Sequence, residues 1–597
     1  MRFGCVIFFS FLLSPTSAEE IVIRVEADKV SEFDSAFDIH FKKDEIIKSK
    51  AKNLGEFLSN VRGFQITKTY QGLSSASFRG LPAGNILVFW NGIKLNDPLD
   101  PSSSFDFSRL ELESASHIQI IRGPEASLWG SGATGAVIFI DSLSVENESS
   151  SNQVAASLAS YETIQGDFQS KIIREKSKTQ FYAQSHYSRG ISAADAKLGN
   201  SERDPRFSIL GHTFESYQLN ERFKINAVAS AHQTKSDADL RGGIGGDDLI
   251  AQDSQTAFAG ALQAHYVLDN YENKTLISFS NDRRYHLNSV EYAKYKSNAL
   301  RIENSHRYKI NNSITFSPAL DFEYEYGKSL ESYGNFSAEK QSIGGRLHVD
   351  SNLSLLNIKT GLRFQKDLKF KDPGSFAFFL NPSIAIQKTS SIFGVSMGRS
   401  YKKPSLYQLF SSYGKKTLAA EKLWSLEANY LQDMTSLKSQ FNITSFWNQS
   451  HNSIDYDFTT QKYSNEGKRE NHGIEATLTT QWISSLKSSI DYTWTQSRAL
   501  RVARQKSTLH IEYLPTKNLS FSTQLQHIGS RKDIDAISYK EKKMPSYQLW
   551  GLRLGYQLTK QLETSLRVDN VLDKHYQEID GYGYQGRYFE VQSKFSF

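Results

Sequence analysis

The residues of this sequence that could do chemistry are mainly basic, acidic and glycine residues. The only cysteine is Cys5, and no HExxH, GxSxG or Cys–His arrangement occurs. The 14 histidines are scattered without the spacing of metal ligands. Gly130, Gly132 and Gly135 resemble a phosphate-binding loop, but no Lys-Ser/Thr pair follows them. These patterns argue against an enzyme and favour a binding or transport protein.

Two acidic clusters contain residue types that bind hard cations. The first runs from Asp195 to Asp204. The second lies in the run DADLRGGIGGDDLIAQD and comprises Asp237, Asp239, Asp247, Asp248 and Asp253. Flexible loops rich in carboxylates are suitable ligands for Ca²⁺. The second cluster lacks the fixed spacing of an EF-hand, and solvated acidic residues on a surface account for it equally well.

Two Arg-Gly pairs stand at the ends of apolar runs. Arg79 precedes Gly80, and Arg122 precedes Gly123. A guanidinium in such a position can hold several carbonyl groups or a carboxylate. Glycines permit a tight backbone path that side chains would obstruct. We therefore expect a structural or gating role for Arg79, Gly80, Arg122, Gly123, Gly130 and Gly132.

The composition indicates β structure in an exported protein. The 597 residues exceed one ordinary core, so at least two domains are expected. Aromatic residues make up 12% and prolines number only 12, which favours strands. The net charge of +6 is modest and the basic residues are dispersed, which argues against nucleic-acid binding. After the N-terminal leader, no run of 18 apolar residues predicts a membrane-spanning helix.

Residues 1–18 have the pattern of a signal peptide. Arg2 supplies the basic region, Phe3 to Leu13 the apolar region, and Thr16-Ser17-Ala18 the small residues at the cleavage point. A buried N-terminal helix is the alternative interpretation.

The pattern of apolar residues changes near residue 150. Within 46–62, Leu54, Phe57, Leu58 and Val61 are spaced as one helical face. Short apolar runs predict buried strands in the same region, which indicates a compact α+β domain; these runs are 86–90, 118–121 and 137–140.

Long alternating strands follow and continue to the last residue. At the end, Phe589, Val591, Phe595 and Phe597 face one way, while polar residues face the other. Strands of about ten residues with a polar inner face fit a membrane β-barrel better than a soluble sandwich. Roughly 22 strands would leave about 20 residues for each strand and its connection. The arithmetic alone does not exclude 16 strands.

Several runs resemble the TonB-dependent receptor family in the same order along the chain. The plug motif is similar to IQIIRGPEASLWGSGATGAVIFI at 118–140. Further similar runs lie at 54–66, 78–80, 86–96, 398–410, 418–430, 463–478, 568–578 and 583–597. The resemblance implies a membrane β-barrel of about 22 antiparallel strands, with an N-terminal α+β plug domain inside its lumen. The expected division is a signal peptide at 1–18, a TonB-box segment at 19–30, a plug at 31–145 and the barrel at 146–597.

The resemblance also implies a location and partners. We expect a barrel in the outer membrane of a Gram-negative bacterium, in contact with its lipid, with TonB and its inner-membrane motor complex as the energy source. TonB would add a strand to Ile21, Val22, Ile23, Arg24 and Val25. A plain first strand of the plug is the alternative, and Arg24 stands where a small or β-branched residue is commoner, which leaves the register open. The terminal Phe597 is the expected signal for the barrel-assembly machinery.

A scarce small-molecule nutrient is the expected ligand, with no cofactor required. Polar stretches at the plug apex predict the binding residues Tyr70, Gln71, Ser74, Asn96 and Asp97. The short mature chain, NDP at 96–98 and DFS at 106–108 resemble the cobalamin-receptor branch, whose comparable loops are ordered by Ca²⁺. A ferric-siderophore receptor is the alternative within the family. A passive porin or adhesin is the alternative from another class.

Overall fold

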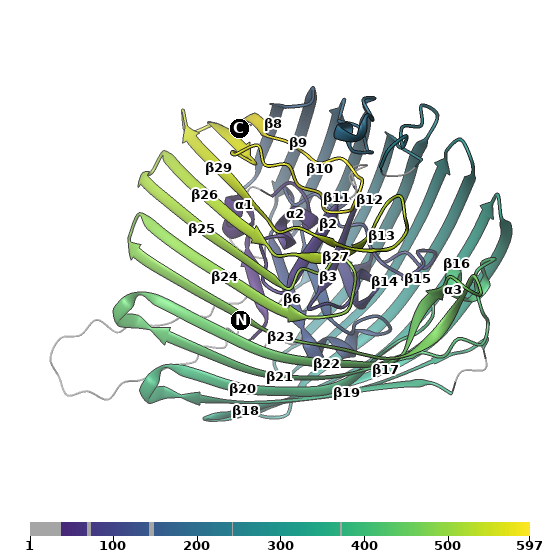
Figure 1. The fold of residues 1–597 in the computed structure, drawn as a ribbon. Coiled ribbons are helices and arrows are strands. Elements are labelled where there is room, and N and C mark those ends of the chain that lie inside the picture. The colour runs from purple at the N-terminus through teal and green to yellow at the C-terminus, as the bar shows by residue number, and fades with distance from the viewer. Residues whose placement is uncertain (1–36, 50, 69–72, 143–148, 241–242, 371–372) are drawn as a thin grey trace.

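The structure is a computed structural model that describes residues 37–49, 51–68, 73–142, 149–240, 243–370 and 373–597 (Figure 1). Within these ranges, no helix has both the length and the apolar character needed to cross a membrane. The chain forms an outer barrel that surrounds an N-terminal plug (Figure 1).

A closed barrel of 22 strands confirms the predicted fold class. Each strand pairs antiparallel with its neighbours, and the last strand pairs with the first. The strands are β8 (Ser151–Ala159), β9 (Thr163–Ile173), β10 (Ser177–Ser188), β11 (Arg206–Asn220), β12 (Phe223–Asp237), β13 (Gln252–Leu268), β14 (Tyr271–Leu287), β15 (Tyr292–Lys309), β16 (Ile314–Glu331), β17 (Gly334–Leu353), β18 (Leu356–Asp367), β19 (Ser375–Ile386), β20 (Ser391–Lys402), β21 (Glu421–Met434), β22 (Ser439–Asp457), β23 (Lys462–Ile483), β24 (Leu486–Gln496), β25 (Gln505–Thr516), β26 (Leu519–Ile528), β29 (Tyr547–Gln557), β30 (Leu562–Asp569) and β31 (Tyr588–Ser596).

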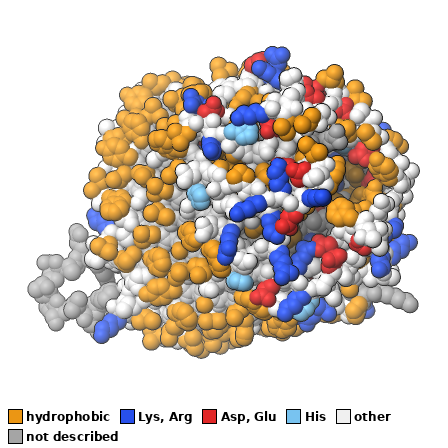
Figure 2. Space-filling model, viewed as in Figure 1, with side chains coloured by type: hydrophobic (Ala, Val, Ile, Leu, Met, Phe, Trp, Pro, Cys, Tyr) orange, Lys and Arg blue, Asp and Glu red, His pale blue; other side chains and the backbone are white. Residues whose placement is uncertain are grey.

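Alternation along each strand separates an apolar outer face from a polar inner face. On β31, Phe589, Val591 and Phe595 are 49%, 50% and 42% exposed, whereas Glu590 between them is buried at 5%. Figure 2 shows hydrophobic side chains around the outside of the visible face and charged side chains gathered in its centre. Because lipid cannot hydrogen-bond to backbone, only a closed sheet of this kind suits a membrane-spanning β-protein.

The connections differ in length at the two rims of the barrel. One rim has tight turns such as 221–222, 269–270 and 517–518, and we call it the short-turn rim. The other, the long-loop rim, has extended connections; these include 189–205, 238–251, 403–420, 529–546 and 570–587. These loops contain η3 (Ala196–Leu198), α3 (Leu406–Phe410) and the hairpin of β27 (Arg531–Ile534) and β28 (Glu541–Met544). The remaining 3-10 turns of the barrel, η4 (Gln387–Thr389) and η5 (Thr435–Leu437), belong to the short-turn rim.

The plug is built on a five-stranded mixed sheet in the order β1-β6-β7-β4-β5. The central strands β4 and β6 are fully buried, and β4 is a continuous apolar run, as expected for a strand covered on both faces. The bounds of the five strands are β1 (Ile39–Lys42), β4 (Ile86–Trp90), β5 (Ile93–Lys94), β6 (His117–Arg122) and β7 (Ala136–Asp141). A separate hairpin consists of β2 (Phe64–Lys68) and β3 (Ser74–Phe78), and two 3-10 turns are η1 (Ala83–Asn85) and η2 (Gly123–Trp129).

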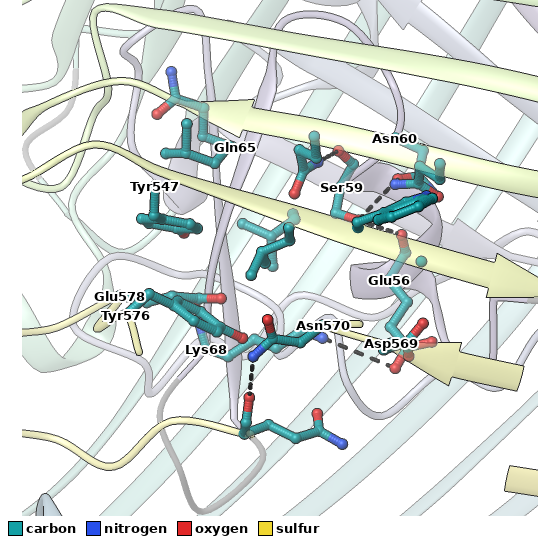
Figure 3. A pocket seen from close by; sticks show the side chains of 18 of the residues that line it. Glu56, Ser59, Asn60, Gln65, Lys68, Tyr547, Asp569, Asn570, Tyr576 and Glu578 are labelled. Atoms are coloured by element: carbon teal, nitrogen blue, oxygen red, sulfur yellow. Dashed lines mark hydrogen bonds and ion pairs between the residues drawn. The ribbon is translucent and has the colours of Figure 1, made fainter. Parts of the chain in front are cut away.

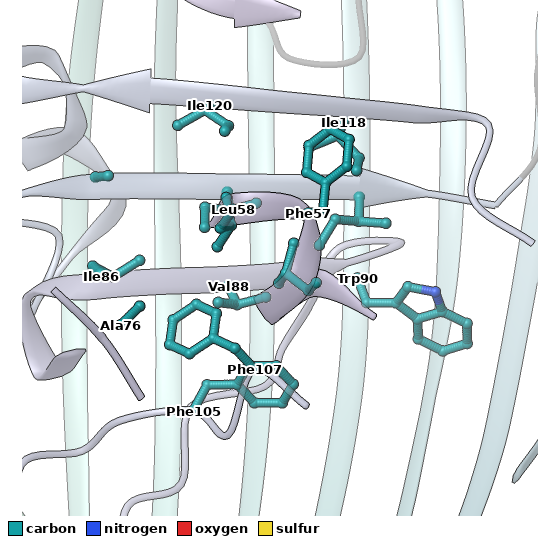
Figure 4. Packing of buried hydrophobic residues seen from close by; sticks show 14 of the residues in the cluster. Phe57, Leu58, Ala76, Ile86, Val88, Trp90, Phe105, Phe107, Ile118 and Ile120 are labelled. Carbon is teal, nitrogen blue, oxygen red and sulfur yellow. The ribbon is translucent and has the colours of Figure 1, made fainter. Parts of the chain in front are cut away.

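The single helical face expected at 46–62 is divided between two short helices. They are α1 (Lys43–Ser49) and α2 (Leu54–Leu58). The helix is interrupted because Asn53 adopts an extended backbone and its side chain accepts a hydrogen bond from the Glu56 amide, which begins a new helix. Leu54, Phe57 and Leu58 are nevertheless buried as the pattern predicts, in the main plug core (Figure 4).

Candidate ligand cavity and the contacts between plug and barrel

A buried ion-pair network joins the plug to the barrel, and we call it the seam network. Arg79 Nε lies 2.7 Å from Glu475 Oε1, and Arg79 Nη1 lies 2.6 Å from Glu427 Oε1. Arg122 Nη1 donates to Glu475 Oε2 at 3.0 Å, and its Nη2 donates to the Phe37 carbonyl at 2.6 Å. The three ion-paired side chains centred on Arg79 are at most 6% exposed. Such charges are tolerated in a dry seam only because each has a charged partner.

The glycines of the plug motif lie where the barrel approaches the backbone closely. A Cβ on Gly123 would stand 1.6 Å from Glu427 Oε1, and its φ of +63° also favours glycine. Gly132 has a φ of +90°, and its amide donates to the Tyr401 carbonyl of β20 at 3.2 Å. Gly123 and Gly132 thus lie at contacts with β21 and β20. Gly80 instead faces Asn471 of β23, and Gly130 faces Arg363 of β18.

A second buried pair holds the same side of the plug. Arg363 of β18 binds Asp321 of β16 through two hydrogen bonds of 2.7 and 2.9 Å. It also donates to the Leu128 carbonyl of η2 at 3.3 Å. Sequence reasoning did not identify Arg363 or Asp321, since a charged residue on an inward strand position is also what a hydrated lumen predicts.

An open cavity lies between the plug apex and the barrel wall towards the long-loop rim. Its volume is about 700 Å³. Its lining includes hydroxyl, aromatic and charged side chains from the plug, β12 to β15 and the loop 497–504.

The charges of this cavity balance among the described residues. Four arginines line it, Arg109, Arg206, Arg284 and Arg501, together with four aspartates, Asp97, Asp100, Asp106 and Asp253. Many are paired: Arg284 Nη2 lies 2.7 Å from Asp97 Oδ2, and His286 Nδ1 lies 2.6 Å from Asp253 Oδ1. The described wall therefore carries charges of both signs with little net charge.

Only some of the predicted ligand-binding residues line the cavity. Ser74 and Asp97 line the cavity. Asn96 is buried, and its side chain is bound to the plug backbone at Ile86, Val88 and Ser103. Its role here is therefore to brace the turn that carries Asp97. Tyr70 and Gln71 lie outside the described residues.

The acidic residues predicted for Ca²⁺ gather partly at the long-loop rim. Asp239 meets Glu202 and Asp204, with one carboxylate oxygen from each within 4.8 Å of the others. Burial, followed by the neighbouring carboxylates, raises the pKa of Glu202 and of Asp204 to about 7. We call these three residues the rim carboxylates.

The other predicted Ca²⁺ ligands are held by separate hydrogen bonds. Asp247 accepts from the Ser201 amide at 3.0 Å, and Asp248 accepts from the Ser289 amide at 2.7 Å. Asp237 accepts from Gln252, and Asp253 faces the cavity beside His286. Glu202 and Asp204 belong to the first acidic cluster of the sequence, so the fold brings the two clusters together.

A smaller polar cavity of about 160 Å³ lies between the plug and the wall formed by β25, β26, β29 and β30. Its plug side includes Glu56, Asn60 and Lys68, which face polar barrel residues (Figure 3). Glu56 Oε2 lies 3.2 Å from Arg567 Nη2, and the Lys68 amide donates to Glu578. This wall therefore contacts the plug through polar groups around a cavity, whereas the ion-paired side chains of the seam network are buried.

Family models match both parts of the chain. The model for the TonB-dependent receptor-like β-barrel matches residues 176–571, and the model for the TonB-dependent receptor plug domain matches residues 31–137. The chain belongs to the TonB-dependent receptor family. Members of this family are receptors and transporters, and a 22-strand barrel of this type is characteristic of the Gram-negative outer membrane.

Solved structures of other family members are similar to this TonB-dependent receptor. The siderophore receptor PirA from Acinetobacter baumannii has a TM-score of 0.82 at 15% identity, covering 94% of this chain and 98% of that one. The ferric enterobactin receptor PfeA from Pseudomonas aeruginosa, in a mutant form bound to enterobactin, has a TM-score of 0.81 at 15% identity, covering 94% and 100%. The copper transporter OprC has a TM-score of 0.80 at 12% identity, covering 94% and 99%. At these identities the likeness establishes the fold alone.

The two ends of this TonB-dependent receptor differ in what the structure describes. The predicted TonB-binding residues 21–25 and the signal peptide lie outside the described residues. Phe597 exchanges backbone hydrogen bonds of 2.8 and 2.9 Å with Asn152, beside the β8–β31 pairing. The predicted assembly signal thus lies where the barrel closes.

Proposed function

We propose that the receptor takes up cobalamin or a related corrinoid, driven by TonB bound to residues 21–25. The observation that supports this choice of ligand is the balanced charge of the large cavity. A ligand that is itself near neutral loses little on entering such a site, and its amide and hydroxyl groups can bond to paired Arg and Asp side chains. A ferric siderophore of catecholate type is an anion and would gain most from an excess of cations.

The alternative ligand is a ferric siderophore. It is supported by the nature of two similar structures, a siderophore receptor and a ferric enterobactin receptor. Paired arginines of the cavity, such as Arg284 beside Asp97, would then have to exchange their aspartate partners for the ligand.

Equilibrium binding to purified receptor tests the choice. We expect saturable binding of cyanocobalamin and much weaker binding of a panel of ferric siderophores. In Asp253→Asn, which leaves the described cavity wall with a net positive charge, the preference should move several-fold towards anionic ligands, because one unit charge at about 4 Å contributes roughly 1–4 kcal/mol. Asp433→Asn, at the short-turn rim, is the matched control and should change neither affinity. Tight binding of an iron chelate without binding of cyanocobalamin would overturn the proposal.

We also propose that the rim carboxylates bind Ca²⁺ and order the loops 189–205 and 238–251. The folded loops raise the pKa values of Glu202 and Asp204, so without a cation the folded arrangement is most stable at low pH and loses stability as pH rises towards about 7. A bound Ca²⁺ would replace the lost protons.

Ca²⁺ removal should therefore act in a pH-dependent way. With a chelator, we expect protease cleavage of these loops to rise several-fold at pH 8 and to change little at pH 5, as measured by mass spectrometry of the fragments. Asp239→Asn should abolish the effect of Ca²⁺, while Asp237→Asn should retain it. Equal cleavage with and without Ca²⁺ at pH 8 would contradict this proposal.

A further inference from the structure

Two histidines meet in the plug at the end that faces the short-turn rim. His40 lies on β1 and His117 begins β6, and these strands pair antiparallel with Lys42 opposite His117. His40 and His117 are therefore diagonal cross-strand neighbours on one face of the sheet. The helix α1, which follows β1 directly, reaches Glu512 of β25 through Lys48 at 3.4 Å, close to the turn 517–518.

The two imidazoles present nitrogen atoms to each other. Nδ1 of His40 lies 3.4 Å from Nε2 of His117. The ring centroids are 5.5 Å apart and the planes are inclined by 34°. The distance between these two nitrogens is well below the distance between the ring centroids. The nitrogen-bearing edges therefore face each other, and the rings do not stack.

This contact can be a long hydrogen bond, with either ring as the donor according to its tautomer. It matches the geometry of two imidazoles on one ion. Metal–nitrogen bonds of about 2.0–2.1 Å at a tetrahedral angle place the two nitrogens about 3.3–3.4 Å apart. The backbone pairing of β1 with β6 places the two histidines on one face, and their rings lie at that spacing without an ion.

The protonation state of His117 also suits a metal. A ligating imidazole must be neutral. His117 is 8% exposed, and its burial, together with the nearby His40 and Lys42, lowers its pKa to about 4. Its Nδ1 has no hydrogen-bond partner among the described residues, so no contact at that nitrogen fixes the tautomer.

We propose that His40 and His117 bind a divalent transition-metal ion that prefers imidazole, Zn²⁺ or Cu²⁺, with water completing its coordination. Imidazole nitrogen favours these ions over Ca²⁺ and Mg²⁺, which prefer oxygen. The site therefore differs in chemistry and position from the rim carboxylates, which lie at the opposite rim.

The ion would join the first described strand of the plug to the next strand of its sheet. The β1–β6 ladder has four residue pairs, and a bridging ion would add a side-chain link across them. β1 is also the described strand nearest in sequence to residues 21–25. An effect of the ion on transport would rest on the TonB contact proposed above. Binding of the ion to the two histidines does not rest on that contact.

Electron paramagnetic resonance of Cu²⁺ added to the purified full-length receptor in detergent tests the site directly. We expect the first equivalent of Cu²⁺ at pH 7 to show superhyperfine coupling to two nitrogens. His40→Gln and His117→Gln should each weaken binding of that equivalent at least tenfold in calorimetry and leave coupling to no more than one nitrogen. Excess Zn²⁺ should displace the signal from the wild-type site.

A matched variant separates this site from the other histidines. His306→Gln, in a barrel histidine that contacts Tyr271, should leave the two-nitrogen spectrum unchanged. A wild-type spectrum with fewer than two nitrogens, or a His40→Gln/His117→Gln double variant with the wild-type titration, would overturn the proposal. A wild-type spectrum with fewer than two nitrogens overturns the proposal even if a variant fails to fold. Neither result depends on cyanocobalamin binding, so the cargo proposal stands or fails separately.

Discussion

Replacing Glu475 with glutamine is expected to release the plug from the seam network. The substitution removes the carboxylate that binds both Arg79 and Arg122, and it leaves the buried Arg122 without an anionic partner at this position. Breaking a buried ion pair by removing one partner costs about 3–5 kcal/mol. We expect a lower unfolding temperature for the plug, faster proteolysis of residues near Arg79, and cells more sensitive to large antibiotics that an intact plug excludes.

An exposed ion pair provides the control for this prediction. Glu162 contacts Arg189 at the long-loop rim, and both side chains are more than half exposed. Glu162→Gln should leave the stability of the receptor nearly unchanged, because water screens the pair. A similar small effect for Glu475→Gln would show that the seam network does not hold the plug.

Deleting residues 21–25 is expected to abolish energised uptake and to leave ligand binding intact. The outer membrane has no ATP and no sustained ion gradient, so a receptor without its TonB contact can bind its ligand but cannot complete transport. Uptake of labelled ligand by whole cells and equilibrium binding to the purified variant would be measured together. We expect uptake at the background level of a strain lacking TonB and a dissociation constant within about twofold of wild type.

Single substitutions refine the deletion test. Ile23→Pro removes a backbone donor that strand addition requires, whereas Ile23→Thr keeps a β-branched residue. We expect strong loss of uptake only with proline. Undiminished uptake after deletion would instead favour the passive porin or adhesin interpretation.

Local patterns in the sequence were sufficient to predict that the chain forms a barrel. Alternation in 589–597 predicts which side chains meet lipid, and the structure exposes Phe589 and Val591 as expected. The number of strands needed more than alternation, because only the plug motif favoured 22 over 16. The break at Asn53 was missed because spacing of apolar residues reports which face is buried and does not report whether the backbone is continuous.

The site was harder to predict because its partners are distant in sequence. Arg79 and Glu475 are separated by 396 residues, and strand registers across the whole barrel determine that they meet. In the same way, Asp239 joins Glu202 and Asp204 only after β11 and β12 have paired. Residue type identified Arg79 and Asp239 as candidates, but it could not give their partners.

The pairing of β31 with β8 has a consequence for assembly. Every other contact in the barrel joins strands that follow one another along the wall, so those pairs can form while the sheet is still open. The β8–β31 pair joins the two ends of the barrel sequence and carries the largest loop-closure entropy. The plug precedes β8 in the chain, so it can fold against a curved, open sheet before the final strand closes the ring. A chain shortened before β31 would therefore leave two unpaired edges around a plug, a species prone to pair with neighbouring chains.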